Sequence, residues 1–204
     1  MSDRDPADHA LIAAIQAGDL KAFEAFYRRY ESVVFRTARS LTRDQMAAED
    51  VVVETFLRAH AARDRIDPER PPVPWLQRIA VNLALNHRRR QRHGTVRLED
   101  SGQELEEASA TPESAVEGHE TARALARCLD RLPGPARAAI VLRYVHGASL
   151  AEIADVLDCP LGTVKSRLHN GLLALRADLR HELALGDPAA DGALSREAEA
   201  RQTP

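Results

Sequence analysis

The chain has 204 residues, a formal net charge of −3 and 44% hydrophobic residues, of which few are aromatic. This length allows one domain or two small ones with packed cores. No run approaches the roughly 18 uninterrupted apolar residues of a membrane span, and the N-terminus MSDRDP lacks the apolar core of a signal peptide. We therefore expect a cytoplasmic protein without membrane insertion.

The small net charge averages over segments of opposite sign. Residues 87–97 carry five arginines and no acidic residue, whereas residues 98–120 carry eight carboxylates and no Lys or Arg. The distribution of charge matters more than its sum for binding nucleic acid, so a nucleic acid partner is compatible with this composition.

The first part of the chain shows helical periodicity. Gly18 ends an opening helix, and Asp19 can cap a longer one in which apolar residues recur at steps of three and four up to Leu41. Four prolines in residues 64–74 indicate a stiff loop that excludes a helix there. The predicted helices are residues 10–17, 20–41, 44–63 and 75–92.

The second part begins after an acidic stretch with too little periodic apolar content to pack by itself. Two further helices, broken at Pro133-Gly-Pro135, and a helix-turn-helix follow it. Nothing indicates a β-strand. We predict an all-α fold of two small helical domains, at residues 10–97 and 119–183, joined by a flexible acidic linker at 98–118 and followed by a disordered tail at 184–204.

The helix-turn-helix is marked by its caps. Ser149 and Glu152 have the spacing of a capping box, Asp158 suits a turn, and Pro160 suits the start of the next helix. In that helix Leu161, Val164, Leu168 and Leu175 share one face. The other face is polar and partly basic, as in a recognition helix that reads duplex DNA. Its candidate DNA-binding residues are Lys165, Ser166, Arg167, His169 and Asn170.

Three motifs in one order closely resemble the extracytoplasmic-function (ECF, group IV) sigma factors of bacterial RNA polymerase, in the sigma-70 family. They are AEDVVVETFLR at 48–58, PWLQRIAVNLALNH at 74–87, and LP at 132–133 with VLRYVHG at 141–147 before the helix-turn-helix. The resemblance covers residues 11–179. It implies a dissociable, non-enzymatic subunit that binds core polymerase, reads promoter DNA and is held inactive by an anti-sigma protein.

The resemblance also implies roles for individual residues. The first domain would capture bases of the melted −10 element and the second would dock the −35 element as duplex. Asn82 is the candidate contact to an extruded base, Trp75 supports that pocket, and the arginines from Arg88 onward hold the DNA backbone. The −10 residues are Trp75, Arg78, Asn82, Asn86, Arg88 and Arg89, and the core polymerase-binding residues are Asp50, Val53, Glu54 and Leu57.

This chain departs from the family pattern at three places. Val53 stands where Gln is common, His60 stands where Trp is common, and residues 170–173 are less basic than in related proteins. The polymerase-binding residues are therefore less well defined than polymerase binding itself, and affinity for the −35 element alone should be modest.

Other classes of protein explain the sequence less well. A self-sufficient DNA-binding regulator would use the N-terminal helices for dimerisation or effector binding. An enzyme would need a catalytic constellation, yet the sequence has no Gly-rich phosphate loop and no nucleophile elbow. Cys128 and Cys159 lack CxxC spacing. We therefore expect no catalytic residues, no metal and no cofactor.

Overall fold

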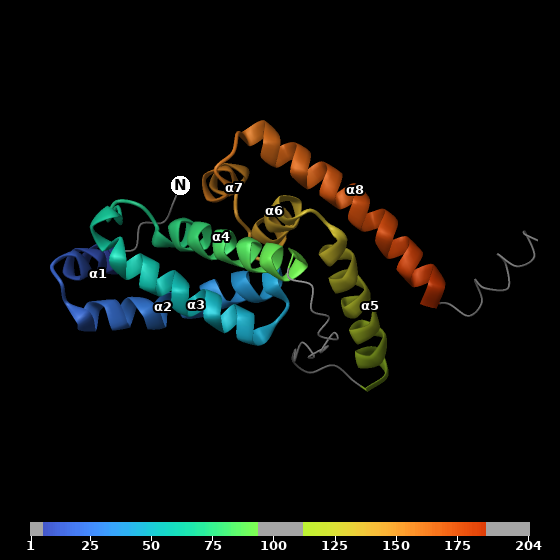
Figure 1. Ribbon diagram of the computed structural model, residues 1–204, viewed down its shortest axis with the longest axis horizontal. Coiled ribbons are helices and arrows are strands. Elements are labelled where there is room, and N and C mark those ends of the chain that lie inside the picture. Colours follow the sequence, from blue (N-terminus) through green and yellow to red (C-terminus); the bar gives the residue numbers. More distant parts are fainter. Residues whose placement is uncertain (1–5, 94–111, 187–204) are drawn as a thin grey trace, which may run out of the picture. The chain divides into compact units, whose positions relative to one another are not determined.

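The structure, a computed structural model, describes residues 6–93 and 112–186 (Figure 1). Every regular element in these two ranges is a helix, as predicted. Most of the predicted linker, up to residue 111, and the predicted tail from residue 187 lie outside the described residues.

The described residues form two compact units. The first contains residues 6–93 and 138–166, and the second contains residues 112–137 and 167–186. The helices α6 (Gly134–Tyr144) and α8 (Leu161–Gly186) each contribute residues to both units. The predicted domain limits come from sequence motifs, whereas these two units are defined by contacts between residues. The domain limits therefore remain a prediction.

The first unit is built around three long helices, α2 (Leu20–Thr42), α3 (Gln45–Ala61) and α4 (Pro72–His93). These three pack against one another. The shorter α1 (Pro6–Gln16) packs on α2 and on the 3-10 turn η1 (Arg63–Arg65), and α7 (Leu150–Leu157) packs on α4. The unit therefore has α4 between α7 and the α2–α3 pair.

Short polar side chains cap the starts of the helices, as predicted for Asp19 and Ser149. The Asp19 carboxylate accepts from the backbone N–H groups of Lys21 and Ala22, and the Asp44 carboxylate accepts from that of Ala47 at 2.6 Å. The predicted capping box is complete, because Ser149 and Glu152 each accept from the other's backbone N–H. These caps satisfy donors that the helix itself leaves without partners.

Apolar faces of α2, α3 and α4 meet in the core of the first unit. Phe26 and Val34 on α2 are fully buried, and the Phe26 and Phe56 rings lie edge to face with centroids 6.3 Å apart. On α4 the buried residues include Leu76, Ala80 and Ala84. The small alanines let α4 approach its neighbours closely, which leaves the polar stripe of α4 on its other side.

The predicted start of the fourth helix was wrong by one turn. α4 begins at Pro72 instead of Trp75, so Pro72 and Pro74 are helical. The prolines exclude a helix interior but not a first turn, where the N–H groups have no partner in the helix in any case. The loop prediction holds for residues 66–71 only.

In the second unit, α5 (Pro112–Arg131) is held to the later turns of α8 by charged groups. Glu182 on α8 accepts from Arg127 at 2.9 Å and also from Arg131. Arg137 is almost fully buried and donates to Asp130 at 3.2 Å. α5 begins at Pro112 and not, as predicted, near His119, because proline is tolerated at the first position of a helix.

Candidate nucleic-acid interface

The predicted recognition residues lie in the first turns of α8. Val164 and Leu168 are buried, and the polar residues lie on the opposite side of the helix. Leu161 was predicted on the packed face, yet it is 44% exposed because it is the first residue of the helix. The exposed members of the predicted set are Lys165, Ser166, His169 and Asn170, and Arg167 is half-buried.

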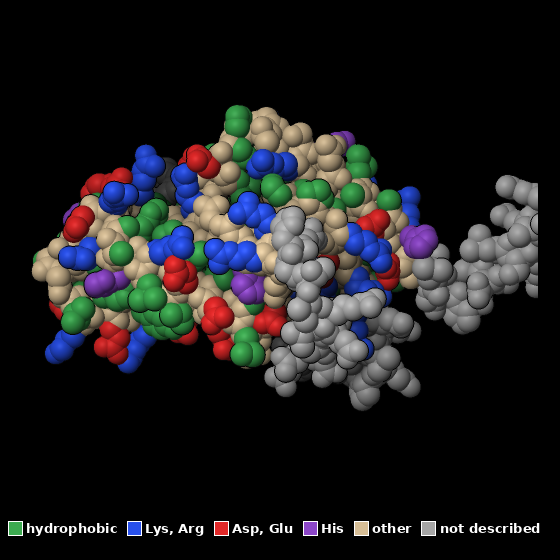
Figure 2. All heavy atoms as spheres, viewed as in Figure 1, with side chains coloured by type: hydrophobic (Ala, Val, Ile, Leu, Met, Phe, Trp, Pro, Cys, Tyr) green, Lys and Arg blue, Asp and Glu red, His purple; other side chains and the backbone are tan. Residues whose placement is uncertain are grey.

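The polar stripe of α4 is exposed over most of its length. Asn82, Asn86 and Arg89 face solvent, whereas Trp75 is half-buried. Figure 2 shows Lys and Arg side chains, in blue, over the part of this face where α4 runs in Figure 1. The stripe offers amide groups and cations on a surface that the core holds rigid.

Arg78 belongs to the same stripe, but its guanidinium already has partners in the first unit. Its Nη2 atom lies 2.9 Å from a carboxylate oxygen of Asp158, and its Nη1 atom makes a long contact of 3.5 Å to the Asp155 carbonyl. Both partners lie at the end of α7. No sequence pattern indicates this pairing, because the two partners are far apart along the chain.

Arg88 also donates to a helix end. Its Nη1 atom lies 3.2 Å from the Leu41 carbonyl, in the last turn of α2. Arg88 therefore ties α4 to the end of α2.

The outer face of α3 carries the predicted polymerase-binding residues. Asp50 is exposed, Val53 and Leu57 are 54% and 61% exposed, and Glu54 is paired with Arg58 at 2.7 Å. Met46 is also 76% exposed, on the same face at helical spacing. An exposed apolar face flanked by carboxylates is typical of a protein-binding surface.

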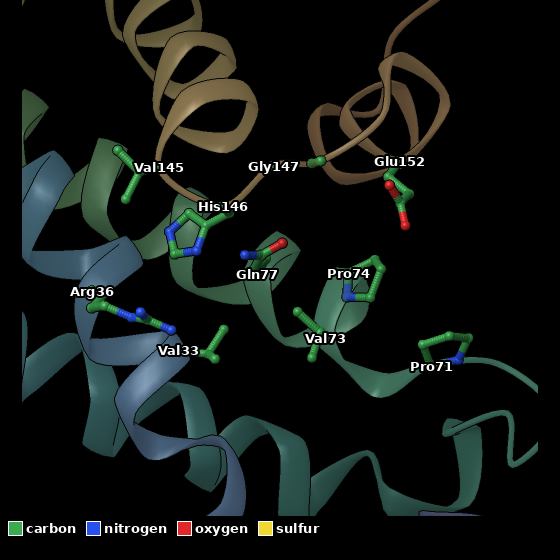
Figure 3. A pocket seen from close by; sticks show the side chains of 11 residues that line it. Val33, Arg36, Pro71, Val73, Pro74, Gln77, Val145, His146, Gly147 and Glu152 are labelled. Carbon is green, nitrogen blue, oxygen red and sulfur yellow. The ribbon is translucent and has the colours of Figure 1, made fainter. Parts of the chain in front are cut away.

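A hollow of about 320 Å³ lies within the first unit (Figure 3). Val33 and Arg36 of α2, Gln77 of α4 and Glu152 of α7 are among the residues that line it. Figure 3 shows Gln77 and His146 pointing into it. His146 Nε2 lies 3.0 Å from the hydroxyl of Thr37, which is fully buried.

Burial lowers the pKa of His146 below its usual value of 6.5, and the nearby Arg36 guanidinium lowers it further. Burial therefore favours the neutral form of the His146 ring, which packs against Thr37. Among the described residues, no helix is both long and apolar enough to cross a membrane. The same part of the chain contains no group of three or more His, Cys, Asp or Glu side chains arranged to hold a metal ion.

Two family models match the chain. The model described as Sigma-70 region 2 matches residues 26–94, and the model described as Sigma-70, region 4 matches residues 122–175. The first covers α2, α3 and α4, and the second covers the helix-turn-helix with the two helices before it.

Relatives match over most of their length. The ECF RNA polymerase sigma factor SigW of Bacillus subtilis is 33% identical over 83% of this chain and 95% of its own. The ECF RNA polymerase sigma-E factor of Escherichia coli is 36% identical over 79% of this chain and 88% of its own.

Solved structures share the fold. CnrH, solved in complex with the cytosolic domain of CnrY, is 29% identical with a TM-score of 0.63, over 86% of this chain and 98% of its own. RpoE, solved with the anti-sigma factor NepR from Bartonella quintana, has a TM-score of 0.61 at 24% identity, over 77% of this chain and 98% of its own. The latter likeness concerns the fold alone.

Acidification should weaken the packing around His146. Because its folded pKa lies below 6.5, the unfolded chain binds more protons between those two values. The contribution of His146 to the free energy of unfolding is therefore complete above about pH 6.5 and decreases as the pH falls below it. We expect the free energy of unfolding, measured with urea, to decrease less between pH 7.5 and pH 5.5 in His146→Asn than in the parent protein. The other histidines are the same in both proteins, so equal decreases in the free energy of unfolding would contradict the assignment to His146.

Proposed function

The chain belongs to the ECF RNA polymerase sigma factors of the sigma-70 family, and from this premise we propose that its three exposed surfaces divide the recognition of promoter and polymerase. A sigma factor is a non-enzymatic initiation factor that directs core RNA polymerase to promoters. The observation that carries the proposal is that the residues of the family motifs are exposed on separate helices, α3, α4 and α8.

The first surface is the start of α8, which we assign to the −35 element as intact duplex. Lys165 and Arg167 supply the charge for phosphates or guanine edges, and the shorter Ser166, His169 and Asn170 suit contacts to bases in the major groove. Intact duplex shows its base edges only in the grooves, which a protruding helix can enter. The exposure of four of the five residues supports this assignment.

The second surface is the polar stripe of α4, which we assign to the −10 element after melting. Melted DNA offers unstacked bases, which amide side chains can recognise along edges that pairing otherwise hides. Asn82 and Asn86 are exposed one helical turn apart, and Arg89 follows on the same side. Trp75 supports this surface from its half-buried position, and the arginines from Arg88 onward hold the phosphate backbone.

The third surface is the outer face of α3, which we assign to core polymerase. Val53 and Leu57 supply apolar contact area, Met46 extends it, and Asp50 supplies negative charge. Glu54 is held by Arg58 in this structure, and such an exposed pair is weak enough to be exchanged for a basic group of the polymerase.

We also propose that a protein inhibitor of the anti-sigma class covers one or more of these surfaces. CnrH, which this chain resembles, was solved in complex with the cytosolic domain of CnrY. An apolar face such as that of α3 requires a partner to cover it when polymerase is absent.

Run-off transcription tests the function as a whole. Purified core polymerase with this protein should produce transcripts from genomic fragments at start sites that core polymerase alone does not use. If a sigma factor of known activity works in the same assay and this protein yields no new start site, the proposal fails. Footprinting of the promoter by the protein alone, at full affinity, would favour a self-sufficient regulator instead.

The two DNA surfaces should be separable by mutation. Lys165→Ala should weaken binding to −35 duplex about tenfold, equal to about 1.4 kcal/mol, which is within the range of one contact to a base. Asn82→Ala should leave that affinity unchanged and reduce open complexes, measured by permanganate reactivity at the −10 element. Arg176→Ala is the control, because it removes an exposed charge from a later turn of α8. Equal losses of core-polymerase affinity in all three variants would contradict the assignment.

Leu57→Ser should lower the affinity for core polymerase about tenfold, because it removes apolar area from the α3 face. Leu57 is exposed, so the free energy of unfolding should change by less than about 0.5 kcal/mol. Fluorescence anisotropy of the labelled protein measures the affinity. Leu183→Ser, at an exposed leucine near the end of α8, is the matched control and should bind core polymerase normally. An unchanged affinity in Leu57→Ser would exclude the α3 face.

A further inference from the structure

The hydroxyl of Ser166 is bonded to its own helix. Its Oγ atom lies 3.0 Å from the Thr163 carbonyl, three residues earlier in the chain. A carbonyl only accepts, so Ser166 donates its proton to the backbone and keeps the lone pairs of its oxygen. Ser166 is exposed in the first turns of α8. In this conformation it offers a ligand an acceptor and no donor.

This polarity restricts the bases that suit Ser166. In the major groove adenine presents a donor at N6 and cytosine presents one at N4, whereas guanine presents the acceptors N7 and O6 and thymine presents the acceptor O4. A hydroxyl that faces guanine or thymine has to donate, which requires its bond to the Thr163 carbonyl to break. Ser166 therefore favours adenine or cytosine on the strand that it faces.

Asn170 lies one helical turn after Ser166 and is also exposed. Its amide carries an acceptor oxygen beside a donor nitrogen. Within residues 6–93 and 112–186 this amide forms no hydrogen bond, so both of its groups are available to a ligand.

The Asn170 amide matches adenine better than any other base. Adenine presents the acceptor N7 beside the donor N6, so the amide nitrogen and oxygen pair with both at once. Guanine presents two adjacent acceptors, and an amide oxygen that faces one of them is left without a donor. An arginine offers two donors and matches guanine instead. The less basic sequence of residues 170–173 therefore changes which base this turn can read.

Ser166 and Asn170 lie on the same side of α8. Residues four apart are neighbours on one face of a helix, and the opposite face holds the buried Val164 and Leu168. Four residues advance a helix by about 6 Å, and base pairs follow one another at about 3.4 Å along the duplex. The two side chains can therefore reach base pairs one or two steps apart.

We propose that Asn170 and Ser166 make the start of α8 selective for adenine. Asn170 pairs with N6 and N7 of one adenine, and Ser166 accepts from N6 of adenine or N4 of cytosine one or two steps away. This inference rests on the proposed function, because it takes the start of α8 as the −35 surface, and it adds the bases that this surface selects.

Selection of DNA by the holoenzyme, which is core polymerase with this protein, tests the base preferences. A promoter mapped by run-off transcription is randomised around position −35, and sequencing of the bound DNA gives the preference at each base pair. The parent should enrich adenine over guanine about tenfold at one position, which is within the range of one bidentate contact. At a second position, one or two steps away, it should enrich adenine or cytosine.

Asn170→Arg should change the preference at the first position from adenine to guanine and leave the other positions unchanged. Asn170→Ala should remove the preference there without creating a new one, which identifies the position that Asn170 reads. Ala174→Arg is the matched control, because it adds the same charge at an exposed residue one turn further along α8. It should leave all base preferences unchanged.

Two variants of Ser166 separate the hydroxyl from the size of the side chain. Ser166→Thr keeps a hydroxyl that can donate to a carbonyl of the preceding turn, so it should keep the preference at the second position. Ser166→Val has the shape of the threonine variant without the hydroxyl and should reduce this preference about fivefold. Circular dichroism verifies that each variant is folded.

The absence of an adenine preference in the parent holoenzyme, or unchanged preferences in Asn170→Arg, would overturn the assignment of adenine to Asn170. Equal preferences in Ser166→Thr and Ser166→Val would exclude the role of the Ser166 hydroxyl. In these cases the parent holoenzyme initiates at its mapped start site, so the proposed function stands. A parent protein that directs no new start site would overturn the proposed function and the base preferences together.

Discussion

The burial of one face of α4 is the constraint on which the rest of the first unit depends. This helix packs against α2, α3 and α7, and Leu76, Ala80 and Ala84 are buried along it. Only the side chains that this packing leaves outside are available to a ligand, and they form the stripe that contains Asn82 and Asn86. A DNA-binding surface on such a helix is rigid because the core holds it.

Two arginines of α4 tie this helix to different neighbours. Arg88 is half-buried and donates to the Leu41 carbonyl in the last turn of α2. Arg78 is exposed, and its two Nη atoms contact the Asp158 carboxylate and the Asp155 carbonyl at the end of α7. Both arginines therefore position α4 by binding acceptors at the end of a neighbouring helix.

Local features of the fold were predictable because they depend on neighbours in the sequence. The caps at Asp19, Asp44 and Ser149 form from residues two or three positions apart. The proline-rich loop is shorter than predicted, because proline is unfavourable inside a helix but is tolerated in its first turn. Leu161 was predicted on a packed face, yet it is exposed, because periodicity identifies an apolar residue without showing whether a neighbour covers it.

The sequence by itself determined the helices, their caps and the order of the family motifs. The motifs in turn determined the membership of the chain in the sigma-70 family. Each of these features depends on residues close together along the chain. Only the tertiary structure decided that α3 keeps an apolar face uncovered, that residues 138–142 are enclosed on all sides, and that Arg78 meets Asp158. Such pairings depend on which buried faces fit together. An apolar stripe indicates that one side of a helix is buried, but it does not identify the helix that covers it.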